Sequence, residues 1–486
     1  MSSKVRRAVV YSSLTRYSLM VIGLASTMVI ARLLTPDEIG TFAIASAITM
    51  VMSEFRLLGA GMYLVREQEL TEDKVRSAMG LTMLISWTMG VGIWFVAPMV
   101  ADLYELPPIA TVFRILSVSF FLAPFISIPT ALLIRGFRFR ELLVIRLATS
   151  LANLGTSVSL VLLGYSFYSL AWGYTTAVLV ESVLVYWFRP PETRWLPSLY
   201  QLGTIMKFGV FSSLAGFFRR GVITAPDMII GKLGTTAQVG IYSRGLGFME
   251  FMSQTLMMGA KPVVLPYLSE VQRVGDDVNG AYIRASVMLG AVLWPVLAVA
   301  SVVSLPTIRL FFGDQWDSAA PLATILAFWA ILRTVHWFSG DLFLAKGLER
   351  FMVVKEASLF ALYFGAIALA FPLGLPAIAS SFVAVGLLDV LLTTGLLAYT
   401  VQLRPLMFFR AWLGNGAMMV VCWLVAWFAY HGALDQGFSL LAGLLVVAVI
   451  LPVVWVSMLY LIRHPLRLEV TNLARWLVRK WAPKQV

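Results

Sequence analysis

Charged residues are scarce in this sequence. Asp, Glu, Lys and Arg make up 13% of its 486 residues, whereas soluble domains carry about 25%. The chain is instead 59% hydrophobic, with a mean hydropathy of +0.85. This composition excludes a water-soluble enzyme, a nucleic-acid-binding protein and a disordered chain, despite a formal net charge of +12. It predicts a protein that lies within a lipid bilayer and contacts membrane lipids.

Cysteine is nearly absent as well. The single cysteine, Cys422, cannot form an internal disulfide, and we interpret it as an apolar packing residue. The sequence holds no phosphate loop with a Walker lysine, no metal-ligand cluster and no hydrolase elbow. We therefore expect no cofactor, no metal and no enzymatic activity. The basic N-terminus leads into an apolar segment without a small-residue cleavage site, so we do not expect a cleavable signal peptide.

Long apolar runs are what the chain has in abundance. A helix needs about 20 mostly apolar residues to cross the hydrocarbon core. Fourteen segments meet this requirement, and the one at 208–231 is the least apolar. Their spans are 12–31, 39–63, 78–100, 112–134, 146–164, 167–188, 208–231, 238–263, 285–304, 320–345, 355–373, 377–400, 411–430 and 438–461. The predicted fold class is an all-α polytopic membrane protein with about fourteen transmembrane helices.

Lysine and arginine alternate between the connections of these segments. Cytoplasmic loops are enriched in both residues. With a cytoplasmic N-terminus, one set of connections holds most of the basic residues, and the other set holds almost only Arg32, Lys232 and Arg309. The bias keeps one sign along the whole chain. We therefore expect an even number of spans, both termini in the cytoplasm and a location in the cytoplasmic (inner) membrane.

The chain contains an internal repeat. Without gaps, residues 11–60 and 211–260 share at least twelve identical residues, and the loop ARLLTPDEIGTF returns as GKLGTTAQVGIY. About four identities would be expected by chance. Six spans separate the copies, so both run in the same direction. Parallel repeats of this kind place a substrate near the midplane, between two halves that rock against each other.

The repeat predicts a domain organisation. Residues 1–200 form an N-terminal lobe of six helices, and residues 201–403 form a C-terminal lobe of six more. Residues 404–462 hold two additional helices, and residues 463–486 form a basic amphipathic tail in the cytoplasm. The tail can be a helix on the anionic inner leaflet or a frayed basic segment that fixes the topology.

The duplicated loop carries a family resemblance. With a cytoplasmic N-terminus, ARLLTPDEIG and its echo DMIIGKLGTTAQVGIYS resemble the Wzx-type polysaccharide transporters of the multidrug/oligosaccharidyl-lipid/polysaccharide exporter superfamily. The resemblance covers about residues 8–460. It implies two six-helix lobes around a cavity that opens alternately to either side. It also implies that an oligosaccharide on a polyprenyl diphosphate is flipped to the outer leaflet for surface polysaccharide synthesis, with a polysaccharide polymerase complex as a candidate partner.

Charges within the spans are the candidate functional residues. A charge in the bilayer is costly, so it normally faces a wet cavity or a partner, and guanidinium groups match a diphosphate with paired hydrogen bonds. The substrate-binding candidates are Arg219, Arg220, Arg56, Arg16, Arg333 and Arg244. The candidates for binding a coupling ion or proton are Asp227, Asp341, Glu250 and Asp389.

Structural roles remain open for these residues. Arg219 and Arg220 lie midway along their span, where either one can face the cavity while the other pairs with an acid. Arg16 can instead reach the lipid headgroups. Arg333, Trp337 and Asp341 follow at spacings of four, as a substrate surface or as an internal ion-pair ladder. Each acid can simply balance a nearby arginine.

Other functions also remain open. A lipid II flippase and a cation-coupled multidrug antiporter are alternatives within the same superfamily. The antiporter would need acidic dominance in the cavity, whereas basic residues are in excess here. A membrane glycosyltransferase or polysaccharide polymerase would need a sizeable external loop, and this sequence has none. A scaffold without transport activity is disfavoured by the charges in the repeated helices.

Overall fold

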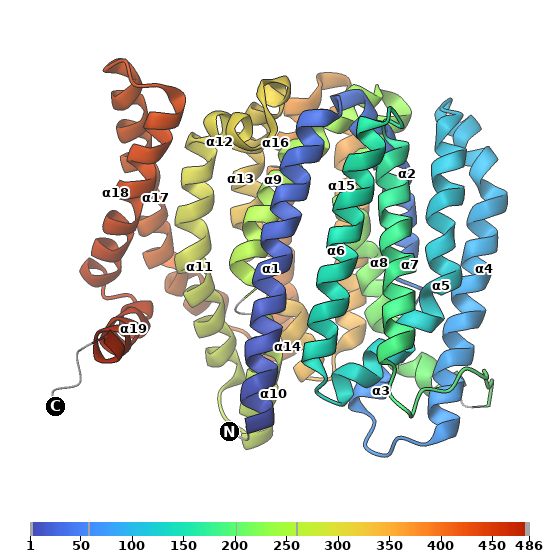
Figure 1. The fold of residues 1–486 in the computed structure, drawn as a ribbon. Coiled ribbons are helices and arrows are strands. Elements are labelled where there is room, and N and C mark those ends of the chain that lie inside the picture. The colour runs from blue at the N-terminus through green and yellow to red at the C-terminus, as the bar shows by residue number, and fades with distance from the viewer. Residues whose placement is uncertain (1–2, 57–58, 201, 259–260, 482–486) are drawn as a thin grey trace. The chain divides into compact units, whose positions relative to one another are not determined.

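The computed structural model describes the whole chain except residues 1–2, 57–58, 201, 259–260 and 482–486. The described residues form helices joined by turns and loops, without any β-strand (Figure 1). Within the described residues, ten segments are long and apolar enough to cross a membrane. The prediction of an all-α polytopic membrane protein is thereby confirmed, while the number of fourteen spans stays a prediction.

The helices group into two compact units. Unit 1 comprises Met1–Arg244, Phe312–Trp316 and Glu349–Leu375, and unit 2 comprises the remainder. Unit 1 holds α1 (Ser3–Leu33), α2 (Pro36–Ser53), α3 (Ala60–Arg66), α4 (Glu72–Tyr104), α5 (Pro108–Arg135), α6 (Phe139–Leu162), α7 (Tyr168–Phe188), α8 (Leu202–Leu233), the first part of α9 (Thr236–Met257), α15 (Glu349–Ala370) and η2 (Phe371–Leu373).

Unit 2 begins within α9. It continues with α10 (Lys261–Val274), α11 (Val278–Val302), α12 (Ser304–Phe312, except its last residue), the second half of η1 (Asp314–Ala319), α13 (Ala320–Thr334), α14 (Ser339–Ala345), α16 (Leu375–Val401, except its first residue), α17 (Pro405–Asp435), α18 (Leu440–Leu461) and α19 (Leu466–Trp481). The units do not follow the predicted boundary at residue 200, because α8 packs on α2, α3 and α4, and α15 packs on α8. The two lobes stay a prediction.

Each predicted span falls on one helix or on two successive helices. The predicted spans 39–63, 238–263 and 320–345 are each divided between two helices: α2 and α3, α9 and α10, and α13 and α14. The last pair still lies within one candidate membrane span, Asp314–Ala345. Before α3, tight turns end α2 and Gly59 adopts a left-handed φ of 70°. Before α14, the His336 ring is fixed by hydrogen bonds with Tyr282 and Thr394, both of 2.8 Å.

The duplicated loop encodes the same helix start twice. Thr35 accepts a hydrogen bond from the Glu38 backbone N–H at 3.3 Å, and the Glu38 carboxylate accepts one from the Thr35 backbone at 2.8 Å. Thr235 and Gln238 repeat this exchange, at 3.2 and 3.0 Å. Such a capping box satisfies N–H groups that have no partner in the first turn of a helix. The threonine and acid or amide of the loop motif therefore have a local structural role.

The glycines of the repeated loop let α2 and α9 approach each other closely. A Cβ on Gly40 would lie 1.7 Å from the Thr236 carbonyl oxygen, and one on Gly240 would lie 2.0 Å from the Pro36 carbonyl oxygen. The two contacts are equivalent under the 200-residue offset of the repeat. Only residues without a side chain fit there, since interiors are close-packed.

Helix pairing within each unit repeats as well. In unit 1, α1 packs on α6 and, one repeat later, α8 packs on α15. The pairs α3–α5 and α4–α5 of unit 1 recur in unit 2 as α10–α14 and α11–α13. Unit 2 also packs α11 against α17, and α17 against α18. The internal repeat is therefore a repeat of packing and not of sequence alone.

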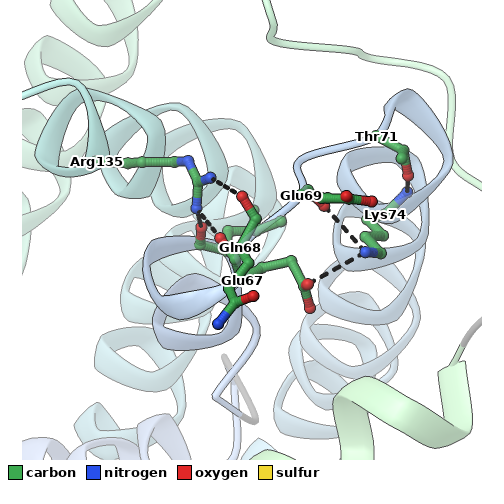
Figure 2. A network of polar contacts seen from close by, with 7 residues as sticks. Glu67, Gln68, Glu69, Thr71, Lys74 and Arg135 are labelled. Atoms are coloured by element: carbon green, nitrogen blue, oxygen red, sulfur yellow. Dashed lines mark hydrogen bonds and ion pairs between the residues drawn. The ribbon is translucent and has the colours of Figure 1, made fainter.

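A polar network joins the loop after α3 to the end of α5 (Figure 2). The Arg135 guanidinium donates to the carbonyl oxygens of Leu64, Glu67 and Gln68, which lie at the open end of α3. The Lys74 ammonium lies 3.2 Å from the Glu67 carboxylate. The Tyr63 hydroxyl and Lys74 hold the pKa of Glu67 below its usual value. The ionised carboxylate thus stabilises this loop above its unfolded pKa, and the contribution is lost as the pH falls through the folded pKa.

The C-terminal segment forms a helix in unit 2. Leu466 and Val470 of α19 pack on the apolar core formed mainly by α17 and α18. His464 accepts a hydrogen bond from the Leu466 backbone at 3.1 Å, and burial lowers the pKa of His464, which favours the neutral ring. Of the two alternatives for the tail, the structure therefore has the helix. Its position on a membrane leaflet stays a prediction.

Candidate functional site

Unit 1 contains a polar cavity of about 730 Å³. Its walls come from the turn after α2 and from α1, α3, α5, α6, α7 and α8. Among the described residues, five charged side chains line it: Glu54, Arg56, Arg146, Glu181 and Arg219. Charges in an apolar protein of this kind mark a wet cavity. We take this cavity as the candidate site.

The two adjacent arginines of α8 have different surroundings. Arg220 forms an ion pair with Glu54, with 3.2 Å between Nε and Oε1. Glu54 can lie this close to α8 because Gly216 has no side chain; a Cβ there would come within 2.8 Å of the carboxylate. Arg219 lines the cavity and forms no ion pair with a described residue. Residues that are neighbours in a helix point about 100° apart, so one arginine of the pair can contact Glu54 while the other faces the cavity.

Arg56 is the second cavity cation without an acidic partner among the described residues. Its Nη1 donates to the Ser119 carbonyl oxygen at 3.3 Å, and its guanidinium lies 5.5 Å from the centre of the Phe120 ring. Its Nε is buried and has no hydrogen-bond partner in the described chain. A buried donor of this kind costs free energy unless a ligand or water accepts its hydrogen bond.

A second ion pair lies on the wall formed by α6 and α7. Arg146 of α6 and Glu181 of α7 are 3.2 Å apart, and their side chains are 45% and 15% exposed. Both acids of the cavity are thus paired with arginines, whereas Arg56 and Arg219 are not neutralised by a described residue. The cavity therefore carries an excess of positive charge and suits an anionic ligand.

Arg146 was missed by the sequence reasoning, as were the neutral polar residues around it. Four polar residues of α6 line the cavity: Arg146, Thr149, Ser150 and Asn153. Their spacing of three or four places them on one face, and this polar stripe in an apolar helix was the available signal. On α5, Ser127 and Thr130 also line the cavity, and their buried hydroxyl oxygens have no hydrogen-bond partner in the described chain.

The other predicted arginines lie outside this cavity. Arg244 is packed in unit 1 between the rings of Phe312 and Trp316, 4.7 and 4.6 Å from their centres. Arg333 lies in unit 2, where it forms an ion pair of 2.5 Å with Glu250. Arg16 of α1 does not line the cavity.

The break before α14 changes the predicted surface around Arg333. Arg333 and Asp341 lie on different helices, so the prediction of one continuous helix face is wrong. The guanidinium nevertheless lies 4.9 Å from the Trp337 ring and 5.1 Å from the Trp329 ring. Aromatic faces attract cations of this kind. With Glu250 as its partner, the side chain is satisfied within unit 2.

The four predicted ion-binding acids are dispersed. Asp227 of α8 accepts a hydrogen bond from the Ser243 hydroxyl and forms no ion pair with a described residue. Glu250 is paired with Arg333 and also accepts from Gln254 at 3.1 Å. Asp389 accepts from Thr393 of its own helix at 2.7 Å, and Asp341 lies in the first turn of α14. Asp227 belongs to unit 1, whereas Glu250, Asp341 and Asp389 belong to unit 2.

Comparison with known proteins identifies the family. Residues 29–321 match the sequence model of a family described as polysaccharide biosynthesis protein. This match covers more than half of the chain. The chain belongs to the polysaccharide biosynthesis protein family. The prediction from the duplicated loop is confirmed at this level.

Members of this family and related proteins show what the chain resembles. It is 24% identical to the succinoglycan biosynthesis transport protein ExoT of Rhizobium meliloti over 66% of this chain. The matched region spans 65% of the length of ExoT, which is just under two thirds. It is 21% identical to the teichuronic acid biosynthesis protein TuaB of Bacillus subtilis, over 73% and 74% of the two chains. The lipopolysaccharide biosynthesis protein WzxC of Escherichia coli is 22% identical, over 69% of each chain.

Solved structures share the fold. The lipid II flippase MurJ in an inward closed conformation matches 94% of this polysaccharide biosynthesis protein and 100% of MurJ, with a TM-score of 0.72 and 14% identity. A MATE protein in a bent conformation matches 87% of this chain and 99% of its own, with a TM-score of 0.55 and 12% identity. At these identities the likeness shows the fold alone.

Proposed function

We propose that this protein is a flippase for a lipid-linked oligosaccharide. The substrate is a saccharide on a polyprenyl diphosphate, which moves from the inner to the outer leaflet of the cytoplasmic membrane by alternating access. The product serves surface polysaccharide synthesis, and a polymerase complex would consume it. The printed names of ExoT, TuaB and WzxC support this assignment.

The observation that carries the proposal is the pair of cations without acidic partners. Arg56 and Arg219 line one cavity, and no described acid neutralises either of them. A diphosphate presents about two negative charges and many acceptor oxygens, which planar guanidinium groups bind with parallel hydrogen bonds. The buried Nε of Arg56 would gain its missing acceptor from such a ligand. Arg220 acts differently: through Glu54 it positions the turn that carries Arg56.

The charge balance also distinguishes the alternatives. A multidrug antiporter that binds drug cations needs unpaired carboxylates in its cavity, yet Glu54 and Glu181 are both paired with arginines. A lipid II flippase would also bind a diphosphate, so this geometry does not separate it from other lipid-linked saccharides. The likeness to MurJ concerns the fold. Competition between lipid II and another lipid-linked saccharide for transfer would separate these two kinds of flippase.

The proposal includes a coupling ion at Asp227. Its carboxylate accepts a hydrogen bond from the Ser243 hydroxyl, and both residues belong to unit 1. A hydroxyl group beside an acid that lacks an ion pair among the described residues suits the binding of a proton or a small cation. Glu250 is less suited, because Arg333 already neutralises it.

The test is transport by reconstituted variants. Arg56→Gln and Arg219→Gln should each slow the appearance of a polyprenyl-diphosphate glycan in the far leaflet by about tenfold to a hundredfold. This range corresponds to about 1.5–3 kcal/mol for one hydrogen bond to a charged group. The matched control is Arg138→Gln, because Arg138 pairs with Glu141 outside the cavity.

Three outcomes would contradict the proposal at different points. Wild-type rates in a double variant that combines Arg56→Gln and Arg219→Gln would exclude a diphosphate site at these two residues. An equal loss in Arg138→Gln would attribute the effect to stability. Wild-type protein that moves no lipid-linked glycan, but exchanges a drug cation for protons, would favour the antiporter.

A further inference from the structure

The wall formed by α6 and α7 contributes no net charge to the cavity. Arg146 and Glu181 form an ion pair, and the remaining polar groups of this wall are neutral. The proposed diphosphate site, by contrast, holds Arg56 and Arg219 without acidic partners. One cavity of about 730 Å³ therefore combines a cationic part with a neutral, polar part.

Asn153 lies in this wall with one face fixed by the protein. Its Oδ1 accepts a hydrogen bond from Ser157 at 3.3 Å. Gly173 of α7 makes this possible, since a Cβ there would lie 2.8 Å from Oδ1 and 1.9 Å from the Ser157 hydroxyl. Asn153 lines the cavity, and its amide nitrogen has no acceptor in the described chain. A side chain held in this way is pre-organised to donate to a ligand.

The ion pair offers a donor and an acceptor side by side. A sugar hydroxyl can donate to the Glu181 carboxylate while its neighbour accepts from Arg146 or Asn153. Tyr174, which lines the cavity and is 37% exposed, adds an aromatic surface with a polar tip. Ser127 and Thr130 of α5 line the same cavity, and their buried hydroxyl groups have no hydrogen-bond partner in the described chain. This combination suits a ring that carries several hydroxyl groups.

The same ion pair disfavours an acidic sugar. A sugar carboxylate that approached Arg146 would also approach Glu181, and like charges at such a site repel each other. Glu181 is the less exposed partner, so it cannot easily turn toward bulk water. Selectivity built on repulsion of the wrong ligand is common in specific sites.

We infer that the α6–α7 wall is a saccharide subsite that accepts an uncharged sugar next to the diphosphate and rejects a uronic acid there. Arg146 and Asn153 donate to the sugar hydroxyls, and Glu181 accepts from one. The inference rests on the proposed flippase function. It adds to that function a prediction that the sugar next to the diphosphate is uncharged, and it assigns this selectivity to Glu181.

The experiment uses two probes that differ at one carbon: polyprenyl diphosphate glucose and polyprenyl diphosphate glucuronate. The full-length protein is reconstituted in vesicles, and the rate of transfer to the far leaflet is measured for both probes. Wild type should favour glucose by about tenfold, the size of a modest electrostatic discrimination. Because both rates come from one preparation, their ratio is independent of the amount of folded protein.

Two variants of the ion pair should shift this ratio in opposite directions. Glu181→Gln leaves Arg146 without its acid, so the ratio should move about tenfold toward glucuronate. Arg146→Gln leaves the Glu181 charge uncompensated, so glucuronate should be rejected more strongly. If one variant does not reach the membrane, the other still decides. Glu141→Gln on the same helix, outside the cavity, should leave the ratio unchanged.

The outcomes separate the inference from the function on which it rests. If wild type transfers neither probe, the proposed function fails. If it transfers both probes at one rate, or transfers glucose with a ratio that neither variant changes, the saccharide subsite is wrong while the flippase stands. A shift in both variants, with Glu141→Gln unchanged, supports the subsite.

Discussion

At the residue scale, the adjacent arginines of α8 show how one helix can serve two purposes. Arg220 is neutralised by Glu54, whereas Arg219 has no acidic partner among the described residues and lines the cavity. A charge in an apolar surrounding is costly unless it is paired or wet. The partner of each arginine, and not its position in the sequence, therefore separates a positioning residue from a candidate ligand-binding residue.

Asp227 yields a prediction at the same scale. Asp227→Asn removes the charge but keeps the size and can still bond to Ser243. If a proton or cation bound there drives transport, an imposed ion or pH gradient should stimulate transfer by the variant about tenfold less than transfer by wild type. Transfer without a gradient should be retained. The measurement compares both rates in vesicles with and without the gradient.

The control for this prediction is Asp435→Asn, which removes an exposed acid at the end of α17. It should leave gradient stimulation unchanged. Stimulation of Asp227→Asn equal to that of wild type would place the coupling site elsewhere.

At the scale of elements, the duplicated loop motif is explained by helix starts and close packing. Thr35 and Thr235 begin α2 and α9 with the same capping exchange, and Gly40 and Gly240 allow the two helices to touch. The motif that carries the family resemblance therefore has a structural role here. It identifies the family but contributes no residue to the cavity.

Substitution of these glycines should destabilise the protein strongly. In Gly40→Ala and Gly240→Ala, the new methyl group would overlap a backbone carbonyl oxygen, and overpacking of this kind costs about 1–3 kcal/mol or more. Thermal unfolding in detergent should show a lower midpoint for each variant. Gly23→Ala and Gly247→Ala are matched helical controls, because nothing lies within 4 Å of a Cβ there; they should be neutral or stabilising by about 0.5–1 kcal/mol. Equal midpoints in all four variants would contradict the close approach.

At the scale of the whole molecule, the alternation of basic residues predicts the topology. The connection between α5 and α6 should face the cytoplasm, and that between α4 and α5 should face the opposite side. Single introduced cysteines test this topology. They are placed in a Cys422→Ser background, so that only the introduced thiol can react; the native Cys422 is buried.

A membrane-impermeant thiol reagent should label Glu105→Cys in intact cells. It should label Arg140→Cys only after the inner membrane is permeabilised. Both positions are exposed, so a missing signal reports the side of the membrane and not burial. The reverse pattern would invert the predicted topology, and a C-terminal fluorescent-protein fusion would check the side of the terminus.

The sequence by itself determined the all-α polytopic membrane class, the approximate position of each helix and the family, because apolar length and a repeated capping motif are local signals. It also brought Arg56 and Arg219 into consideration through the cost of charge in a membrane. Three helix breaks, such as the one before α14, were not determined, because apolar composition continues through Val335, Trp337 and Phe338.

Only the tertiary structure decided which charges meet. Glu54 and Arg220 are 166 residues apart, and Arg146 and Glu181 lie on different helices. Pairing over such distances depends on how helices pack, which hydropathy and spacing do not contain. For this reason the sequence supplied a set of intramembrane charges, and the fold selected the few that line one cavity.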